Sequence, residues 1–257
     1  MRTIVVLFVL LSCSQQALSQ VHTETVDYRI GDTLYTGYLA YDSTSGRSRP
    51  GILIVHEWWG ITPFIQKKTE QLARMGYVAF AADIYGKGIR ATTVQEAQTI
   101  VGQFYGDRKL LRQRAAGLAI LQKNRLTDPK RIGAIGYCFG GMTALELARS
   151  GADIAGVVSF HGGLATPNPD DAKNIKAKIL VLTGGDDPNV PPSQVTAFED
   201  EMRKANIDWQ LVSYGGAVHS FTNPASGSDN SKGAAYNENA DKRSWEVMKS
   251  FFSEIFK

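Results

Sequence analysis

Short apolar runs of strand length alternate along the chain with longer segments in which apolar residues recur every three or four positions. The first pattern is typical of strands buried on both faces, and the second of amphipathic helices. We expect buried strands at residues 51–57, 77–86, 131–138, 154–162, 177–187 and 209–216. We expect helices at residues 62–76, 92–105, 107–124, 140–151, 192–206 and 240–256.

Residues 26–42 follow a different pattern, because apolar and polar positions alternate there on both sides of Gly31 and Asp32. Such alternation around a Gly-Asp pair predicts an antiparallel hairpin. Strands that alternate with helices predict a mostly parallel sheet covered on both faces. The fold class is therefore α/β, with an N-terminal hairpin before a doubly wound sheet. The polar stretch 222–240 is expected to be a surface loop near the carboxyl ends of the strands.

Residues 1–19 combine a basic start, an apolar run and a small-residue cleavage pattern. This combination predicts a secretory signal peptide cut after Ser19, which leaves residues 20–257 as a single domain. The apolar run is too short to span a bilayer as a helix. The stretch LLSC also resembles a bacterial lipobox, so a lipid anchor at Cys13 is an alternative. In both cases we expect an exported protein, secreted or periplasmic, with no membrane-spanning helix.

Composition and charge narrow the possible partners. Hydrophobic residues make up 43% of the 257 residues, which is enough for a sizeable core. The formal net charge is +3, and basic residues are interleaved with acidic ones, so the sequence predicts no nucleic-acid surface. It contains no metal-ligand motif and no G-x-G-x-x-G motif, and we therefore expect no metal, no cofactor and a small-molecule substrate.

A nucleophile-elbow motif stands between the predicted strand 131–138 and the helix after it. The stretch GYCFGG places Cys138 at the nucleophile position between Gly136 and Gly140. The glycines permit the tight strand-to-helix turn that exposes such a residue. Free N–H groups at the helix start favour a thiolate, and the N–H of Phe139 would face the oxyanion formed by attack on a carbonyl. We predict that Cys138 is a catalytic nucleophile, with a buried structural cysteine as the alternative.

A cysteine nucleophile requires a base and an acid that orients it. His219 lies in a loop between the last predicted strand and the last helix, whereas His56 and His161 end buried strands and are expected in the core or behind the site. The stretch GGDDPNVP places Asp187 at the acid position, with Asp186 as the neighbouring alternative. Nucleophile, acid and base then occur in the chain order of α/β-hydrolase folds.

A carboxylate ends the predicted buried strand 51–57. Burial of the Glu57 carboxylate costs free energy unless the group is paired or functional. We therefore predict a catalytic role for Glu57, with an ion pair to a nearby Arg or Lys as the alternative. The backbone N–H of Trp58 lies where such folds supply a second oxyanion donor. Trp59 is expected to line a substrate pocket or to pack.

The motifs HEWWG, AADIYGKG, GYCFGG, GGDDPNVP and HSF together resemble those of the dienelactone hydrolase family of α/β-hydrolases. The resemblance runs from about Val26 to the C-terminus. It implies a triad of Cys138, His219 and Asp187 and an oxyanion hole formed by the two backbone N–H groups named above. It also implies that Glu57 contacts the resting thiol until substrate binding frees the thiolate.

The sequence departs from family enzymes that act on dienelactone itself, which use arginines to hold the substrate carboxylate. Asn223 stands where one of these arginines follows the catalytic histidine, and Lys87 and Arg90 are the nearest candidates for the other. We expect a hydrolase of carboxylic esters or lactones that works through a thioester acyl-enzyme. The alternatives are a broad extracellular carboxylesterase for apolar esters and a non-catalytic binding protein of the same fold.

Overall fold

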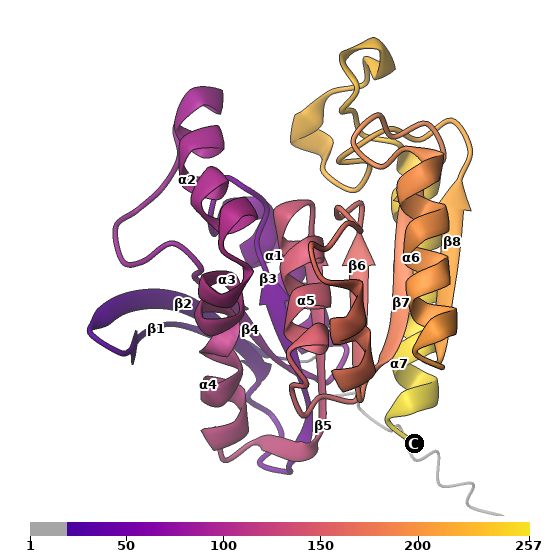
Figure 1. Ribbon diagram of the computed structural model, residues 1–257. Helices are drawn as coiled ribbons and strands as arrows, with labels where there is room; N and C mark the ends of the chain where they lie inside the picture. The colour runs from indigo at the N-terminus through magenta and orange to yellow at the C-terminus, as the bar shows by residue number, and fades with distance from the viewer. Residues whose placement is uncertain (1–19) are drawn as a thin grey trace, which may run out of the picture.

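The computed structural model describes residues 20–257 and arranges their strands in one sheet (Figure 1). The strands are β1 (Val21–Ile30), β2 (Thr33–Asp42), β3 (Arg49–Val55), β4 (Val78–Ala82), β5 (Thr127–Tyr137), β6 (Gly156–Phe160), β7 (Lys178–Gly184) and β8 (Trp209–Tyr214). The helices are α1 (Pro63–Arg74), α2 (Val94–Gly106), α3 (Arg108–Arg114), α4 (Leu118–Lys123), α5 (Phe139–Arg149), α6 (Pro192–Lys204) and α7 (Glu238–Ile255). The expectations for the signal peptide, the cut after Ser19 and a lipid anchor at Cys13 lie outside the described residues.

The strand order confirms the predicted fold class. The sheet runs β1-β2-β4-β3-β5-β6-β7-β8, with β1, β2 and β4 paired in antiparallel fashion and the other neighbours parallel. The N-terminal hairpin closes at Gly31, whose φ of 57° suits the tight turn between Ile30 and Thr33. The order is that of an α/β-hydrolase fold, and the crossovers bring the carboxyl ends of β3 and β5–β8 to one edge.

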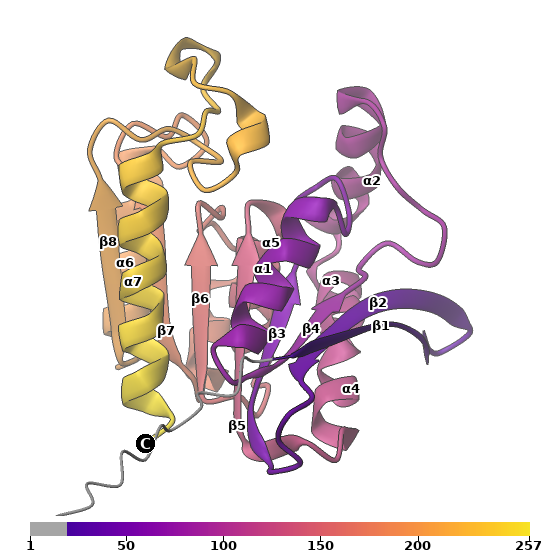
Figure 2. The same cartoon turned by 180° about the vertical axis from the view of Figure 1, so that it is seen from behind.

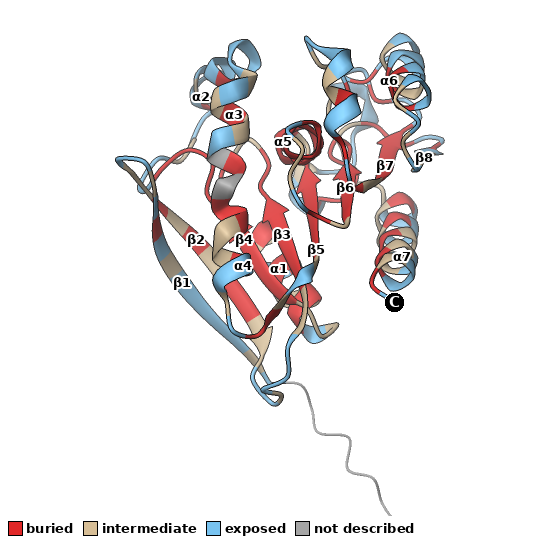
Figure 3. Ribbon diagram, turned by 60° about the horizontal axis from the view of Figure 1, so that its bottom comes forward, coloured by how far each residue is buried: buried red, intermediate tan, exposed pale blue. Residues whose placement is uncertain are grey.

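Helices cover both faces of the sheet, as the apolar strand runs require. Helices α1 and α7 lie on one face, and α3 to α6 lie on the other (Figures 1 and 2). Along β3, Ile52 and Ile54 belong to the core under α1 and α7, whereas Leu53 and Val55 belong to the opposite core. Alternate side chains of one strand thus fill two cores, which is why the central strands β3, β4, β6 and β7 are buried along most of their length, whereas the edge strand β1 is largely exposed (Figure 3).

Several boundaries differ from the sequence-based expectation; β1, for example, begins at Val21 instead of Val26, and β4 ends at Ala82 instead of Gly86. Residues 107–124 form not one helix but α3, a 3₁₀ turn at Ala115–Gly117, and α4. The break coincides with a close approach to β4, because a Cβ on Gly117 would lie 2.8 Å from the Cβ of Ala82. Strand β5 also begins earlier than expected, since Arg49 pairs with Thr127 before a register shift.

The polar stretch after β8 folds back towards the strand ends. It contains two 3₁₀ turns, Pro224–Ser226 and Asn230–Lys232, and it returns to pair Ala234 with His219 (Figure 1). This agrees with the expected loop at the carboxyl edge. Among the helices of residues 20–257, none is long and apolar enough to cross a membrane.

Close packing of α7 on β5 yields a first prediction. A Cβ on Gly133 would lie 2.5 Å from Cε1 of the buried Phe252. We expect Gly133→Val to lower the free energy of unfolding in urea by about 1–3 kcal/mol, because overpacking displaces that ring. Gly102→Ala is the control: its Cβ would meet nothing within 4 Å, and reduced chain entropy should raise stability by about 0.4–1 kcal/mol. Equal stability of the two variants would contradict the packing argument.

Candidate active site

Four of the residues predicted to be functional follow the carboxyl ends of parallel strands. Glu57 comes after β3, Cys138 after β5, Asp187 after β7 and His219 after β8. Because those strand ends share one edge of the sheet, residues far apart in the sequence meet in one place.

The turn at Cys138 is a strained nucleophile elbow. Cys138 has φ 56° and ψ −117°, a conformation that few non-glycine residues adopt. A Cβ on Gly136 would lie 1.9 Å from the carbonyl oxygen of Gly140, and one on Gly140 would lie 2.2 Å from that of Val55. Only glycine fits at these two positions, so the local sequence forces the chain to turn sharply and to project the thiol beyond the sheet.

The side chains of Cys138, His219 and Asp187 form a continuous hydrogen-bonded chain. The Nε2 of His219 lies 3.0 Å from the Sγ of Cys138, and its Nδ1 lies 2.8 Å from the Oδ2 of Asp187. The other oxygen of Asp187 accepts a hydrogen bond from the N–H of Asn189 at 2.8 Å. With Nδ1–H donating to the carboxylate, Nε2 is free to accept the thiol proton.

The surroundings of His219 favour its charged form. Burial alone disfavours the imidazolium, but attraction to the ionised sulfur of Cys138 and the hydrogen bond with Asp187 act against this and raise the pKa of His219 well above its ordinary value. The side chain is 14% exposed. A proton taken from the thiol is therefore held on the ring, which is suited to a base that must later act as an acid.

The two adjacent aspartates are in different environments. Asp187 is buried against His219, whereas Asp186 is exposed and its N–H donates to the carbonyl of Ala217. The described structure therefore brings Asp187, and not the alternative Asp186, to the imidazole.

Glu57 is buried and belongs to the same cluster. Its carboxylate accepts hydrogen bonds from Ser220 Oγ at 3.2 Å and from Asn223 Nδ2 at 2.8 Å. Burial raises the pKa of Glu57, and these two donors together with His219 oppose the shift. The contact with the resting thiol that the resemblance implies is not among the hydrogen bonds of residues 20–257, in which Cys138 Sγ bonds to His219 instead.

The two expected oxyanion donors lie in the wall of one cavity. Phe139 opens α5, so its N–H is among the first helix N–H groups, which have no intrahelical acceptor. The backbone of Trp58 is fixed by a hydrogen bond, in which its carbonyl accepts from Tyr85 Oη at 2.9 Å. Both residues line the cavity that contains Cys138 and His219.

His56 supports this corner of the site from the core. Its Nδ1 lies 2.6 Å from the carbonyl oxygen of Glu57, and its Nε2 accepts the N–H of Ile84 at 3.2 Å. Complete burial lowers the pKa of His56 to about 4, so the ring stays neutral and ties the end of β3 to the segment after β4.

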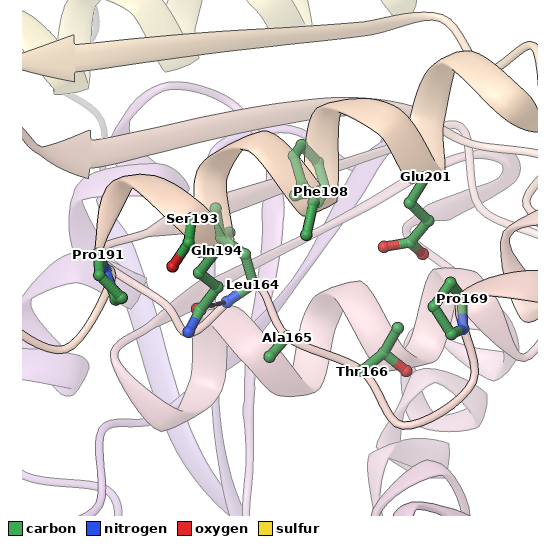
Figure 4. A pocket seen from close by; sticks show the side chains of 10 residues that line it. Leu164, Ala165, Thr166, Pro169, Pro191, Ser193, Gln194, Phe198 and Glu201 are labelled. Atoms are coloured by element: carbon green, nitrogen blue, oxygen red, sulfur yellow. Dashed lines mark hydrogen bonds between the residues drawn. The ribbon is translucent and has the colours of Figure 1, made fainter.

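The cavity has a volume of about 1050 Å³, and both aromatic and polar residues line it. Trp58, Trp59 and Phe64 are among the aromatic residues, and the polar loop after β8 contributes several of the polar ones. Figure 4 shows a second, smaller groove of about 290 Å³, which shares Ala165 and Gln194 with the main cavity.

Arg108 is a basic residue of the cavity wall that sequence reasoning missed. Its Nη1 contacts Met142 Sδ at 2.7 Å, its guanidinium lies over the ring of Tyr105, and its Nε is buried without a hydrogen-bond partner. Among the described residues no ion pair joins it to a carboxylate, because the nearby Glu146 is paired with Arg112 and Arg149. Burial lowers the pKa of Arg108 from its ordinary value, which leaves it charged at neutral pH.

The two basic residues considered from the sequence are engaged elsewhere. Lys87 pairs with Asp27 of the hairpin, and Arg90 pairs with Asp83 at 3.5 Å beneath Gly60. Neither lines the cavity that holds Cys138. Within residues 20–257, no group of three His, Cys, Asp or Glu side chains is arranged to hold a metal ion.

Comparison with known proteins identifies the family of the chain. The family model described as the dienelactone hydrolase family matches residues 36–256. The chain belongs to the dienelactone hydrolase family. As a member it is a hydrolase, which sets the non-catalytic alternative aside.

Solved structures and curated proteins include close relatives in this family. A dienelactone hydrolase-like promiscuous phosphotriesterase from metagenomic libraries is 38% identical, with a TM-score of 0.88 over 92% of this chain and 99% of that one. The dienelactone hydrolase of Anabaena variabilis is 21% identical, with a TM-score of 0.68 over 93% of this chain and all of the other. A protein of Aquifex aeolicus with the provisional name carboxymethylenebutenolidase is 27% identical over 91% of this chain and 99% of its own.

Three contributors to this dienelactone hydrolase-family site were not predicted as such. Ser220 and Asn223 bind Glu57, and Arg108 adds a charge to the cavity. From the sequence, Asn223 was recognised only as the residue that stands where enzymes acting on dienelactone have an arginine. Its position beside the histidine motif is a local signal, but its partner lies far away in the sequence, which no local pattern reveals.

The different environments of the two aspartates allow a direct comparison. Asp187→Asn should lower kcat by about 10³–10⁴-fold, because an amide at that site no longer holds His219 in the tautomer that accepts the thiol proton. Asp186→Asn, the matched control, should leave kcat within about threefold of wild type, since the exposed carboxylate does not reach the imidazole. Rates of ester hydrolysis measured for both variants test this assignment. A larger loss of kcat in Asp186→Asn would identify Asp186 as the acid of the triad.

Proposed function

We propose that this protein hydrolyses carboxylic esters or lactones through a Cys–His–Asp triad and a thioester acyl-enzyme. The observation that carries the proposal is the unbroken contact chain at the cavity: Cys138 Sγ to His219 Nε2 at 3.0 Å and His219 Nδ1 to Asp187 Oδ2 at 2.8 Å. A nucleophile, its base and the group that orients the base meet where a substrate carbonyl can enter.

In the first half of the reaction, His219 Nε2 takes the thiol proton and Cys138 Sγ adds to the substrate carbonyl carbon. The N–H groups of Phe139 and Trp58 stabilise the oxyanion that forms on the carbonyl oxygen. The carbon–oxygen bond then breaks, and His219 returns its proton to the leaving alkoxide. The products are an alcohol and a thioester on Cys138; in a lactone the alcohol remains attached to the acyl group.

In the second half, His219 removes a proton from water as the water oxygen attacks the thioester carbonyl. The same two N–H groups stabilise the second oxyanion, and the carbon–sulfur bond breaks. The carboxylic acid leaves, and the proton on His219 returns to the sulfur. Asp187 remains ionised throughout and holds the imidazole in place.

Glu57 contributes to this proposal through charge and position. When ionised, its carboxylate lies near His219 and attracts the imidazolium formed in each half-reaction, and the attraction is mutual. Its hydrogen bonds to Ser220 and Asn223 hold the residues that flank the base.

The cavity wall favours two kinds of substrate. Trp58, Trp59 and Phe64 offer an aromatic surface suited to an apolar ester, which supports a broad carboxylesterase as the second candidate. Arg108, which forms no ion pair within the described part of the chain and whose Nε is buried without a hydrogen bond, instead suits a substrate that carries an anionic group. A substrate panel with and without such a group separates the two.

Removal of the thiol tests the proposal itself. Cys138→Ala should lower kcat for ester or lactone hydrolysis by about 10⁴–10⁶-fold, because no other nucleophile stands at the elbow. The side chain is small and partly exposed, so the fold should persist, as circular dichroism can show. Wild-type enzyme quenched during turnover should also carry a thioester on Cys138, with the added mass of the acyl group for an ester and of the whole substrate for a lactone. A folded variant with near-normal turnover would refute the cysteine mechanism.

Replacement of Arg108 tests the anionic substrate. Arg108→Gln should raise KM about tenfold or more for esters with a free carboxylate, because a charge-assisted contact is worth about 1.5–3 kcal/mol, and leave neutral esters nearly unchanged. Lys87→Gln is the control, since it removes the same charge outside the cavity. A neutral phosphotriester belongs in the panel because one relative is described as a promiscuous phosphotriesterase. Equal effects on anionic and neutral esters would favour the broad carboxylesterase.

A further inference from the structure

His161 is a fully buried histidine that the triad does not use. It directly follows β6, and its N–H donates to the carbonyl of Leu182 on β7 at 2.8 Å, which anchors it to the sheet. Burial lowers the pKa of His161 well below its ordinary value, and the positive charge of His219 acts in the same direction. The ring is therefore neutral.

The two ring nitrogens of His161 contact both halves of the triad region. Nδ1 accepts a hydrogen bond from the N–H of Cys138 at 3.1 Å, and this N–H is shared with the carbonyl of Phe160 at 3.0 Å. Nε2 lies 2.8 Å from Oγ1 of Thr222, which follows His219 in the same loop. Since Nδ1 accepts, the proton of the neutral ring is on Nε2, which donates to the hydroxyl.

Backbone strain is concentrated around this ring. Among residues 20–257, the non-glycine residues with positive φ are Cys138 at 56°, His161 at 40°, Ser220 at 59° and Asn206, which lies outside the site between α6 and β8. Such conformations persist only where surrounding contacts hold them. The segments that carry the nucleophile and the base are thus kept in place by local contacts, and those of His161 join one segment to the other.

Apart from the bonds that His219 itself makes to Asp187 and Cys138, the loop that carries it is attached to two strand ends through side chains. Glu57, beyond β3, binds Ser220 and Asn223, and His161, beyond β6, binds Thr222. The rings of His161 and His219 also meet edge to face, with centroids 5.3 Å apart. Without the His161 attachment, the residues that follow His219 keep their side-chain bonds to Glu57, but those bonds do not reach the segment of Cys138.

We propose that His161 is a positioning residue whose neutral ring couples the backbone of the nucleophile to the loop of the base and so sets the distance between Cys138 Sγ and His219 Nε2. The measurement of kcat that tests this proposal rests on the proposed hydrolytic function. A thiol and its base must be aligned to within a fraction of an ångström, and a displacement of about 1 Å can cost about 10²-fold in rate.

The sharpest variant leaves residue 161 and its strained backbone untouched. Thr222→Val replaces the hydroxyl with a methyl group and should lower kcat about 10²-fold with KM nearly unchanged, because the bound substrate keeps its contacts. Alkylation of Cys138 by iodoacetamide at neutral pH should slow as well, since His219 then supports the thiolate less well. Thr183→Val is the matched control: Thr183 is equally buried and its Oγ1 has no hydrogen-bond partner.

A second variant separates the two bonds of the ring. His161→Asn places an acceptor oxygen where Nδ1 stood, and asparagine tolerates positive φ, but its side chain is too short to reach Thr222. It should therefore match Thr222→Val, and the double variant should be no worse than either one because both changes break the same link.

The outcomes separate this proposal from the proposed function. If Thr222→Val is folded and keeps both kcat and alkylation rate within about twofold of Thr183→Val, His161 is only a core residue. The same conclusion follows if the losses of kcat caused by His161→Asn and by Thr222→Val multiply in the double variant. If the wild-type protein cleaves no ester or lactone, the proposed function fails, while the alkylation rate of the free enzyme still tests His161. If His161→Asn does not fold, Thr222→Val alone decides.

Discussion

The contact of Gly136 with the backbone of Gly140 is the constraint on which the site depends. It brings the start of α5 directly over the end of β5, and the second contact, of Gly140 with Val55, places the same helix end against β3. Cys138 is thereby forced out of the sheet at φ 56°. Cys138 and Phe139, the first residue of that helix, both line the cavity, so in the proposed mechanism one close packing of glycines presents both the nucleophile and a donor for the oxyanion.

The proposed base, His219, is positioned in a different way, because it belongs to neither a helix nor a strand. His219 lies in a long loop, and its own backbone is paired with the returning chain at Gly233 and Ala235. Side chains from two other strand ends, Glu57 and His161, hold the residues around it. The alignment of thiol and imidazole thus combines a rigid backbone turn on one side with a network of buried hydrogen bonds on the other, and such networks are sensitive to the loss of any member.

The sequence predicted the features that depend on local pattern. Apolar runs marked the strands, and glycines around Cys138 marked the elbow, because both requirements act on neighbouring residues. Contacts across the fold were not predictable in this way. The helix break at Gly117 reflects an approach to Ala82, and the role of Asn223 reflects a bond to Glu57, which is 166 residues away in the chain. Nothing near Asn223 in the sequence identifies that partner.

Three histidines of the site region are buried or nearly buried, and the shifts of their pKa values follow from their different neighbours. His56 and His161 bond to backbone groups and a hydroxyl, and burial lowers the pKa of both. His219 bonds to a carboxylate and a thiol, which raise its pKa in spite of burial. Burial by itself therefore makes a neutral, structural histidine, and an anionic partner is needed to make one that holds a proton. In the proposed mechanism, the proton released by Cys138 is therefore held by His219, which lines the cavity, and a leaving group can take it there.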